Sequence, residues 1–429
     1  MKKVFHYLFF DDYELSTPIS ILGNILAMFT ALSVCVLVTG FLYMISWKHF
    51  MYYVACGISL LFLVVKGGIS INKRMLLFYT VIILNVLVLP IDPVFRAQQR
   101  AMAFIFVTMV CSPVLESETA VAYRERVFKY VLIGFTILTV LSFFCFFLGI
   151  NMMPYNREGD VELYDDYINN GGKFSGLFNH SMIFGPIAAI VSLVNFNLYM
   201  KNHKSIRLIL FVLCSVACVF SASRAALLAL ASGFAFVLFK GLVSRKSYIS
   251  FGRICLLAFI TVLAILPIAD IAFSGLMNKI EMTQDLFGGN NSREWKYESR
   301  LYEFKESPLL GVGFASIDTS TGDAYDMISG RIEPGSAHLA VLAQTGLVGM
   351  LAYIVLLIGA LKVMRKRSSL SSYIAYAMFW LFFAHGWGEG WIFAPGGMIC
   401  FMFWLSLSQC YDLKFKESVN DGQSLINYE

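Results

Sequence analysis

Arginine, serine, histidine and glutamate side chains beside apolar runs are the residues of this chain best suited to handling an anionic substrate. Ser223 and Arg224 open one such run, in the order Ser221-Ala222-Ser223-Arg224. Hydroxyls, unpaired backbone N–H groups and a guanidinium at a helix start together suit a phosphate group. An arginine at the end of a membrane span can instead extend its charge to the interface, so the pattern alone leaves both interpretations open.

A second group of charged residues lies in the one long polar segment, about residues 274–337. Arg293 occurs in Ser292-Arg293-Glu294-Trp295-Lys296, Arg300 follows in an amphipathic stretch, and Arg331 lies near the segment's end. The amphipathic stretch is predicted to be a helix that lies on the membrane surface. Such charged runs are also common on solvated helix faces. In a chain this apolar, however, we expect any chemistry to occur in this segment.

Two residues near the end of this segment are candidates for a general base. Glu333 comes shortly before His338, and His338 begins the next apolar run. Either side chain has the chemistry to take a proton from a hydroxyl group. Farther away, Arg96 and Arg100 form a basic pair shortly after an apolar run ends. Glu389 lies between two apolar runs, where a carboxylate is costly unless it pairs with an arginine or contacts substrate.

The elements that position these residues are predicted to be membrane-spanning helices. The 429 residues are 58% hydrophobic and 14% charged, against about 25% charged residues in soluble domains. We predict an all-α polytopic membrane protein, a single integral membrane domain over 1–429 with about twelve transmembrane helices. One long periplasmic loop, 274–337, is predicted to contain short amphipathic helices. The spans are expected near 19–45, 50–65, 75–91, 99–115, 128–150, 178–200, 206–222, 224–243, 252–273, 338–361, 370–387 and 391–411.

The predicted topology depends on the boundary between the spans at 206–222 and 224–243, where Arg224 interrupts a nearly continuous apolar run. With the N-terminus in the cytoplasm, most of the 33 lysines and arginines fall in cytoplasmic segments, as the positive-inside rule requires. Both termini are then cytoplasmic and the long loop faces outward. The first apolar run is too long for a cleavable signal peptide.

The sequence contains no pattern typical of metal, nucleotide or nucleic-acid chemistry. The nine cysteines lie in or beside apolar spans and lack metal-ligand spacing. Neither a P-loop nor a Rossmann fingerprint occurs. The net charge of +5 follows the membrane topology and does not indicate nucleic-acid binding. We therefore expect no cofactor, no metal and no disulfide in the long loop.

Several of these landmarks, in their order along the chain, resemble one family. The Ser223-Arg224 helix start is followed by a long outer loop that contains Arg293 and ends near Pro308-Leu309-Leu310-Gly311-Val312-Gly313. A Leu-x6-Gly-x2-Gly pattern then ends at Gly349. This arrangement is similar to that of the O-antigen ligase and O-antigen polymerase superfamily, and the similarity is best over about 174–363.

One departure from the family pattern concerns the base. The ligases typically have His-Asn/Ser nine residues before Gly-x-x-Gly, and here Gly335-Ser336 occupies that position. His338 comes three residues later, within about one helical turn, so Glu333 is kept as the alternative base. The Glu333–Ser336 and Glu389–Gly397 runs look more like those of repeat-unit polymerases than of ligases.

The resemblance implies a metal-independent glycosyl transfer on the periplasmic face of the bacterial inner (cytoplasmic) membrane. The donor would be a glycan on undecaprenyl diphosphate. A polymerase would use another lipid-linked repeat as acceptor, and a ligase would use lipid A-core. The polymerase is the favoured alternative, with a chain-length regulator as a further partner. A flippase or transporter is a third alternative, because many spans also suit that class.

The resemblance also implies roles for the polar residues. The implied reaction requires neutralisation of the departing diphosphate, a role that preorganised guanidinium groups fill well. We assign it first to Arg224 and Arg293, with Arg300, Arg331, Arg96 and Arg100 as lesser candidates. The proton acceptor would be His338 or Glu333. The diphosphate-binding residues would be Arg224, Arg293, Arg300 and Arg331. The further substrate contacts would be Ser223, Arg96, Arg100 and Glu389.

Overall fold

The computed structural model describes residues 15, 18–40, 42, 47–152, 174–243, 294–323, 325–365, 367 and 369–426. Within these residues all regular structure is helical, apart from three isolated β-bridges. The predicted all-α class is therefore confirmed for the described part of the chain. The helices are α2 Ile21–Val38, α3 Lys48–Gly67, α4 Lys73–Val88, η1 Pro93–Phe95, α5 Ala97–Cys111, α6 Glu118–Phe147, α8 Ser181–Asn202, α9 Ser205–Phe220, α10 Arg224–Val243, α13 Glu294–Glu306, η3 Thr319–Thr321, α14 Ala337–Arg365, α15 Leu370–Gly388 and α16 Met398–Ile426.

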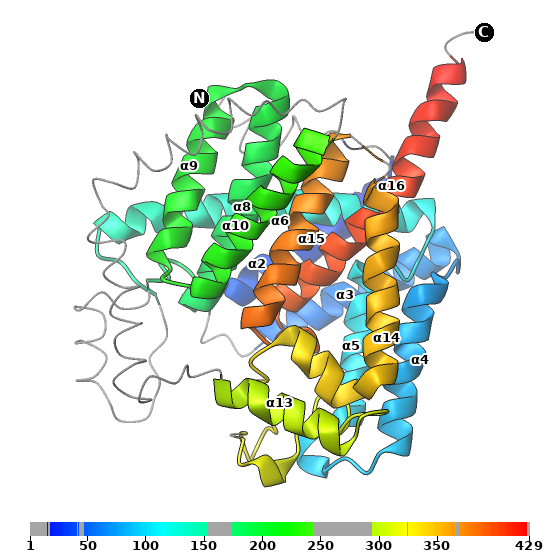
Figure 1. The fold of residues 1–429 in the computed structure, drawn as a ribbon. Helices are drawn as coiled ribbons and strands as arrows, with labels where there is room; N and C mark the ends of the chain where they lie inside the picture. The colour runs from blue at the N-terminus through cyan, green and yellow to red at the C-terminus, as the bar shows by residue number, and fades with distance from the viewer. Residues whose placement is uncertain are drawn as a thin grey trace.

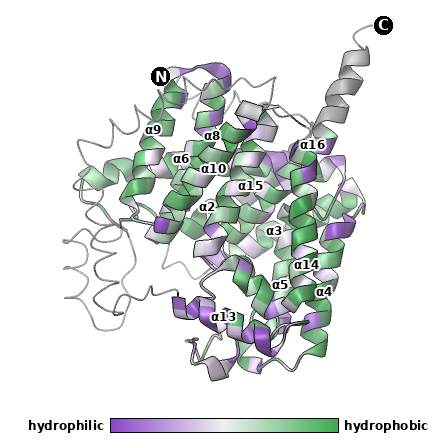
Figure 2. Ribbon diagram, viewed as in Figure 1, coloured by the Kyte–Doolittle hydropathy of each residue, from purple (hydrophilic) through white to green (hydrophobic). Residues whose placement is uncertain are grey.

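Helices lie at eleven of the predicted spans, and six of those helices are long and apolar enough to cross a membrane. Figure 2 shows that these helices are largely hydrophobic, whereas polar residues gather on α13 and the turns beside it. The predicted span at 252–273 lies outside the described residues, so the total of twelve stays a prediction.

Local sequence signals explain where several helices begin. The Asn72 side chain accepts hydrogen bonds from the backbone N–H groups of Arg74 and Met75 at the start of α4, at 3.0 and 3.3 Å. Ser117 and Ser369 cap α6 and α15 in the same way. A side-chain oxygen at this position satisfies a backbone N–H that has no partner within the helix.

The doubtful boundary between α9 and α10 is confirmed as a break between two helices. α9 ends at Phe220 and α10 begins at Arg224. Between them, Ala222 has a positive φ of 49°, a left-handed conformation that ends a helix. The Ser221–Ser223 turn therefore sets Arg224 at the first position of α10.

α10 and α15 lie side by side and run antiparallel (Figure 1). The Ser232 hydroxyl donates to the Trp380 carbonyl at 3.4 Å, and Lys240 reaches Ser372 nearer the other end. Continuing this register toward the start of α10 brings Arg224 level with the end of α15 at Gly388. The N-terminal end of α10 and the C-terminal end of α15 therefore lie at the same end of the bundle. Because α13 also lies there, we call it the α13 end of the bundle.

A buried ion pair joins α6 to α16. Arg124 donates to both carboxylate oxygens of Asp412, from Nε at 2.9 Å and from Nη2 at 2.6 Å, and to the Leu115 carbonyl at 2.9 Å. Both side chains are almost completely inaccessible. A buried charge is tolerated when its partner and the remaining hydrogen bonds are both supplied, so this pair contributes to structure and not to a substrate site.

Candidate functional site

A cavity of about 820 Å³ lies at the α13 end of the bundle. Its walls come from the starts of α3 and α5, the segment 325–334, the first turns of α14 and the loop 390–397. Four of the residues predicted to bind or process substrate line it, namely Arg96, Arg100, Arg331 and Glu333. Segments far apart in the sequence therefore bring this subset of predicted site residues together.

Arg100 fixes the shape of one wall. Its guanidinium donates to the carbonyls of Ala315 at 3.1 Å, Ser329 at 3.0 Å and Gly330 at 2.7 Å. Gly330 has φ +63° and packs so closely on η1 that a Cβ there would lie 2.0 Å from the Val94 carbonyl oxygen. Only glycine fits that approach, so this contact and Arg100 together hold the segment 325–334 against α5.

The cavity carries an excess of positive charge. Of its two carboxylates, Glu333 forms an ion pair with Lys296 at 2.8 Å. Asp326 accepts from the Ile328 and Ser329 N–H groups at 2.8 and 3.2 Å and from the Ser329 hydroxyl, and these hydrogen bonds lower its pKa. Neither Arg331 nor Arg96 forms an ion pair with any described residue. Their charges are available to an anionic ligand.

The Pro308–Gly313 segment joins α14 next to Ala315 and Gln344, two residues that line the cavity. Gly346 interrupts that helix with φ 63° and ψ −165°, which frees backbone groups on both sides. The N–H groups of Val312 and Gly313 donate to the Ala343 and Gln344 carbonyls at 2.9 and 3.2 Å. In return, the N–H of Leu347 donates to the Pro308 carbonyl at 2.8 Å.

Two buried amides complete this joint. Asn85 donates to the carbonyls of Leu310 and Gln344 and accepts from the Phe314 N–H at 2.6 Å. Gln344, which lines the cavity, accepts from the Ala315 N–H at 3.1 Å. The polar segment is thereby bound to a membrane-spanning helix through backbone and amide groups that are satisfied on both sides.

His338 lies outside the cavity, in the contact between α14 and α15. Its Nε2 is 2.9 Å from the Phe383 carbonyl, and the Tyr353 hydroxyl is 3.4 Å from Nδ1. The ring also packs beside Phe383 and Trp387. A carbonyl accepts only from a protonated nitrogen, so Nε2 carries the proton and Nδ1 faces Tyr353. This histidine is held by structural contacts at both nitrogens.

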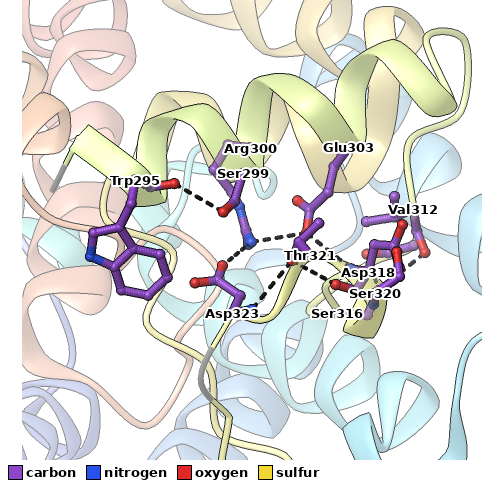
Figure 3. Close-up of polar contacts among 11 residues, drawn as sticks. Trp295, Ser299, Arg300, Glu303, Val312, Ser316, Asp318, Ser320, Thr321 and Asp323 are labelled. Carbon is purple, nitrogen blue, oxygen red and sulfur yellow. Dashed lines mark hydrogen bonds and ion pairs between the residues drawn. The ribbon is translucent and has the colours of Figure 1, made fainter.

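Arg300 is enclosed between two carboxylates (Figure 3). It forms an ion pair with Glu303 at 2.9 Å and another with Asp323, and it is 1% exposed. Glu303 also accepts from the Asp318 N–H at 2.9 Å. Burial raises the pKa of Glu303 to about 7, despite the charge of Arg300, and raises that of Asp323. The cluster fastens the 318–323 turn to α13 and leaves Arg300 no free charge for a diphosphate.

Of the remaining predicted residues, Ser223 and Arg224 lie at the start of α10, and Glu389 follows the last residue of α15. Arg224 is half-buried at the first position of α10 and makes no hydrogen bond or ion pair with another described residue, while Ser223 is buried beside it. The Glu389 carbonyl accepts from the Ala337 N–H at 2.9 Å, which joins the end of α15 to the start of α14. Arg293 lies outside the described residues.

Sequence reasoning missed the α3 wall, and it singled out the Glu389–Gly397 run without predicting that this loop lines the cavity. His49 and Tyr53 line the cavity from the first turns of α3, and Gly396 faces both side chains. The signal available was a histidine next to Lys48 at the start of an apolar run. Nothing in its spacing relates it to the long polar segment, because the contact is made only when distant helices pack together.

A comparison with protein families finds one match. The family model described as O-antigen ligase matches residues 209–354, which run from α9 through α10 and α13 to the first half of α14. This match supports the O-antigen ligase and polymerase superfamily for this part of the chain. Together with the apolar helices, it points to a multi-pass membrane protein. No curated protein matches the chain.

Proposed function

We propose that the protein transfers a glycan from undecaprenyl diphosphate to a sugar hydroxyl at the periplasmic face of the inner membrane, without a metal or cofactor. The observation that carries the proposal is the positively charged cavity at the α13 end. Arg331 and Arg96 line it without carboxylate partners among the described residues. Both side chains are exposed at the cavity, and guanidinium groups beside a departing diphosphate stabilise its charge. The apolar helices supply the surroundings that a polyprenyl tail requires.

In this proposal the polar segment also excludes water from the donor. The segment 325–334 is fixed over the cavity by Arg100 and by the Lys296–Glu333 ion pair. Bound donor and acceptor would complete the closure of the site, which favours attack by an acceptor hydroxyl over hydrolysis. Arg224, beside Ser223 at the start of α10, is proposed to bind the donor diphosphate from this neighbouring helix. Arg293, outside the described residues, is proposed to bind the diphosphate as well. Glu389 is proposed as a substrate contact there.

We favour a repeat-unit polymerase, in surface polysaccharide synthesis, over a ligase. The Glu333–Ser336 and Glu389–Gly397 runs support this choice, while the description of the matched family supports the ligase as second candidate. Deletion of the gene separates the two. Core lipid capped with a single repeat indicates a lost polymerase, whereas long chains that accumulate on the lipid carrier indicate a lost ligase.

The diphosphate role is tested by Arg331→Ala in cells that lack the native copy. We expect loss of long-chain polysaccharide on a gel at normal protein level, and Arg331→Lys to restore only part of it, because lysine lacks the bidentate geometry. Lys305→Ala, at an exposed position of α13, is the matched control. Normal polysaccharide chains in Arg331→Ala would show that Arg331 does not bind the diphosphate. The same assay applies to Arg224→Ala.

A further inference from the structure

We propose that His49, in the first turn of α3, takes the proton from the acceptor hydroxyl. The inference rests on the proposed glycosyl transfer and adds a catalytic residue to it from outside the segment that matches the family. His49 lines the cavity that also contains Arg331 and Glu333. It reaches this cavity from α3, whereas Arg331 and Glu333 lie in the segment 325–334.

His49 differs from the other described histidines in having no hydrogen-bond partner among the described residues. His180 caps α8 through Nδ1, and His385 accepts from the Trp391 indole at 2.9 Å. His203 has an interaction at the turn before α9, and His338 is engaged at both nitrogens. A neutral imidazole needs one nitrogen with a free lone pair to accept a proton. His49 meets that requirement within the cavity.

The space beside the His49 ring is open. A Cβ at Gly396 would lie 3.8 Å from His49 Nδ1 and 3.4 Å from the Tyr53 hydroxyl. His49 and Tyr53 are one helical turn apart, so their side chains share one face of α3. Because Gly396 has no side chain, an incoming hydroxyl can approach the imidazole and the phenol between α3 and the loop.

The carboxylates of the same cavity are poorer bases in this arrangement. Glu333 is bound to the ammonium group of Lys296 at 2.8 Å, and Asp326 accepts three hydrogen bonds from its own turn. Both interactions favour the ionised form and therefore reduce its tendency to take up a proton. The imidazole of His49 forms neither an ion pair nor a hydrogen bond with a described residue, so its lone pair is free to take the acceptor proton.

The reaction step balances as follows. The acceptor oxygen forms a bond to the anomeric carbon of the donor, and the bond from that carbon to the diphosphate oxygen breaks. Its electron pair leaves with undecaprenyl diphosphate, whose charge Arg331 and Arg96 offset. The acceptor proton passes to an imidazole nitrogen of His49 and is then released to water, which returns His49 to its neutral form for the next transfer.

The test uses purified full-length protein and lipid-linked glycans extracted from cells that lack the gene, with lipid A-core added in parallel. We expect His49→Gln to reduce kcat at least about 100-fold, the typical contribution of a general base, with little change in KM for the donor. The rate of the variant should rise with pH, because hydroxide replaces the missing base, whereas the wild-type rate should level off.

The other ionisable groups around the cavity are the same in the wild type and in His49→Gln. They are Lys48 and Tyr53 on α3, Arg96 and Arg100 on α5, and Tyr325, Asp326, Arg331 and Glu333 on the segment opposite. His203→Asn, at the exposed turn between α8 and α9, removes a histidine away from the cavity and should keep the wild-type rate and pH profile.

Two outcomes separate the inference from the function on which it rests. If the wild-type protein joins no lipid-linked glycan to either acceptor, the proposed function fails. If the wild type is active and His49→Gln matches it in kcat and pH profile, only the role of His49 fails. Carbethoxylation of the wild type gives a check that needs no variant. Activity should fall in parallel with modification of His49 and return with hydroxylamine, and full modification with retained activity would contradict the role.

Discussion

At the scale of single residues, the surroundings of an arginine decide what it can bind. Arg300 and Arg331 belong to the same polar segment. Arg300 is enclosed by Glu303 and Asp323, whereas Arg331 is exposed at the cavity without a carboxylate partner among the described residues. A buried guanidinium that has already been neutralised stabilises the fold, and moving it toward a ligand would leave two buried carboxylates unpaired. The same residue type is thus structural on α13 and available for a ligand at the cavity.

The Glu303 carboxyl makes the stability of the α13 cluster depend on pH. Its pKa in the folded protein, about 7, lies above its ordinary value of 4.5, so the folded state retains a proton that the unfolded chain releases. Stability from this group is therefore complete below pH 4.5 and is lost as the pH rises to about 7. We expect the thermal unfolding midpoint in detergent to be lower at pH 8 than at pH 5.5.

The contribution of Glu303 is isolated by substitution. Glu303→Gln has no proton to lose, so its midpoint should fall less between the two pH values than that of the wild type. Glu306→Gln, on the same helix but exposed, should behave like the wild type. An equal fall in Glu303→Gln and wild type would assign the pH dependence to other groups.

At the scale of elements, the joint between the Pro308–Gly313 segment and α14 holds together the residues next to Ala315 and Gln344, which line the cavity. At Gly311 a Cβ would lie 2.4 Å from the Ala343 carbonyl oxygen, and at Gly346 a Cβ would lie 2.3 Å from the Leu309 backbone. Each glycine therefore lets the opposite segment approach closely enough for the two segments to exchange backbone hydrogen bonds. The close approach at the break in α14 is the structural reason for glycine at both Gly311 and Gly346.

Substitution of Gly346 tests whether this close approach maintains the joint. Gly346→Ala adds two costs, the left-handed φ of 63° and the overlap with Leu309. Gly322→Ala is the control for a positive φ without overlap, because its φ is +74° and its ψ 9°, and nothing lies within 4 Å of the added Cβ. The conformational cost is about 1–2 kcal/mol for the left-handed Gly322 and up to about 3 kcal/mol for Gly346, whose ψ of −165° lies in a region that only glycine readily adopts. We expect Gly346→Ala to lower the unfolding midpoint clearly more than Gly322→Ala and to abolish long-chain polysaccharide. Equal effects of the two would mean that strain alone, and not the joint, matters.

These elements also show what the sequence could and could not predict. The helices follow from apolar runs and capping residues such as Asn72 and Ser117, because those signals are local. The pairing of Arg300 with Asp323 depends on a turn folding back over α13. The place of His49 depends on α3 packing beside α5 and the loop 390–397. Neither contact leaves a periodic pattern, so the sequence could not indicate which charges of the polar segment are free.

At the scale of the whole molecule, the charge distribution predicts which side of the membrane the cavity faces. Lys201, Lys204 and Arg207 lie at the α8–α9 turn, and basic residues also end α14. Basic turns of this kind stay on the cytoplasmic side. The α13 end lies at the opposite ends of these helices, since α9 and α10 meet there at the Ser221–Ser223 turn. The cavity should therefore open to the periplasm, where a lipid-linked glycan is presented.

Cysteine labelling tests this orientation in intact cells. Ser320→Cys places a thiol on exposed η3, and Lys204→Cys places one at the exposed α8–α9 turn. The described native cysteines give little background, because seven are buried and Cys35 is half-buried. A membrane-impermeant maleimide that reaches the periplasm should label Ser320→Cys directly and Lys204→Cys only after the inner membrane is opened. The reverse labelling pattern would mean the opposite membrane orientation, with Arg96, Arg331 and His49 on the cytoplasmic side. It would rule out transfer from a donor presented in the periplasm.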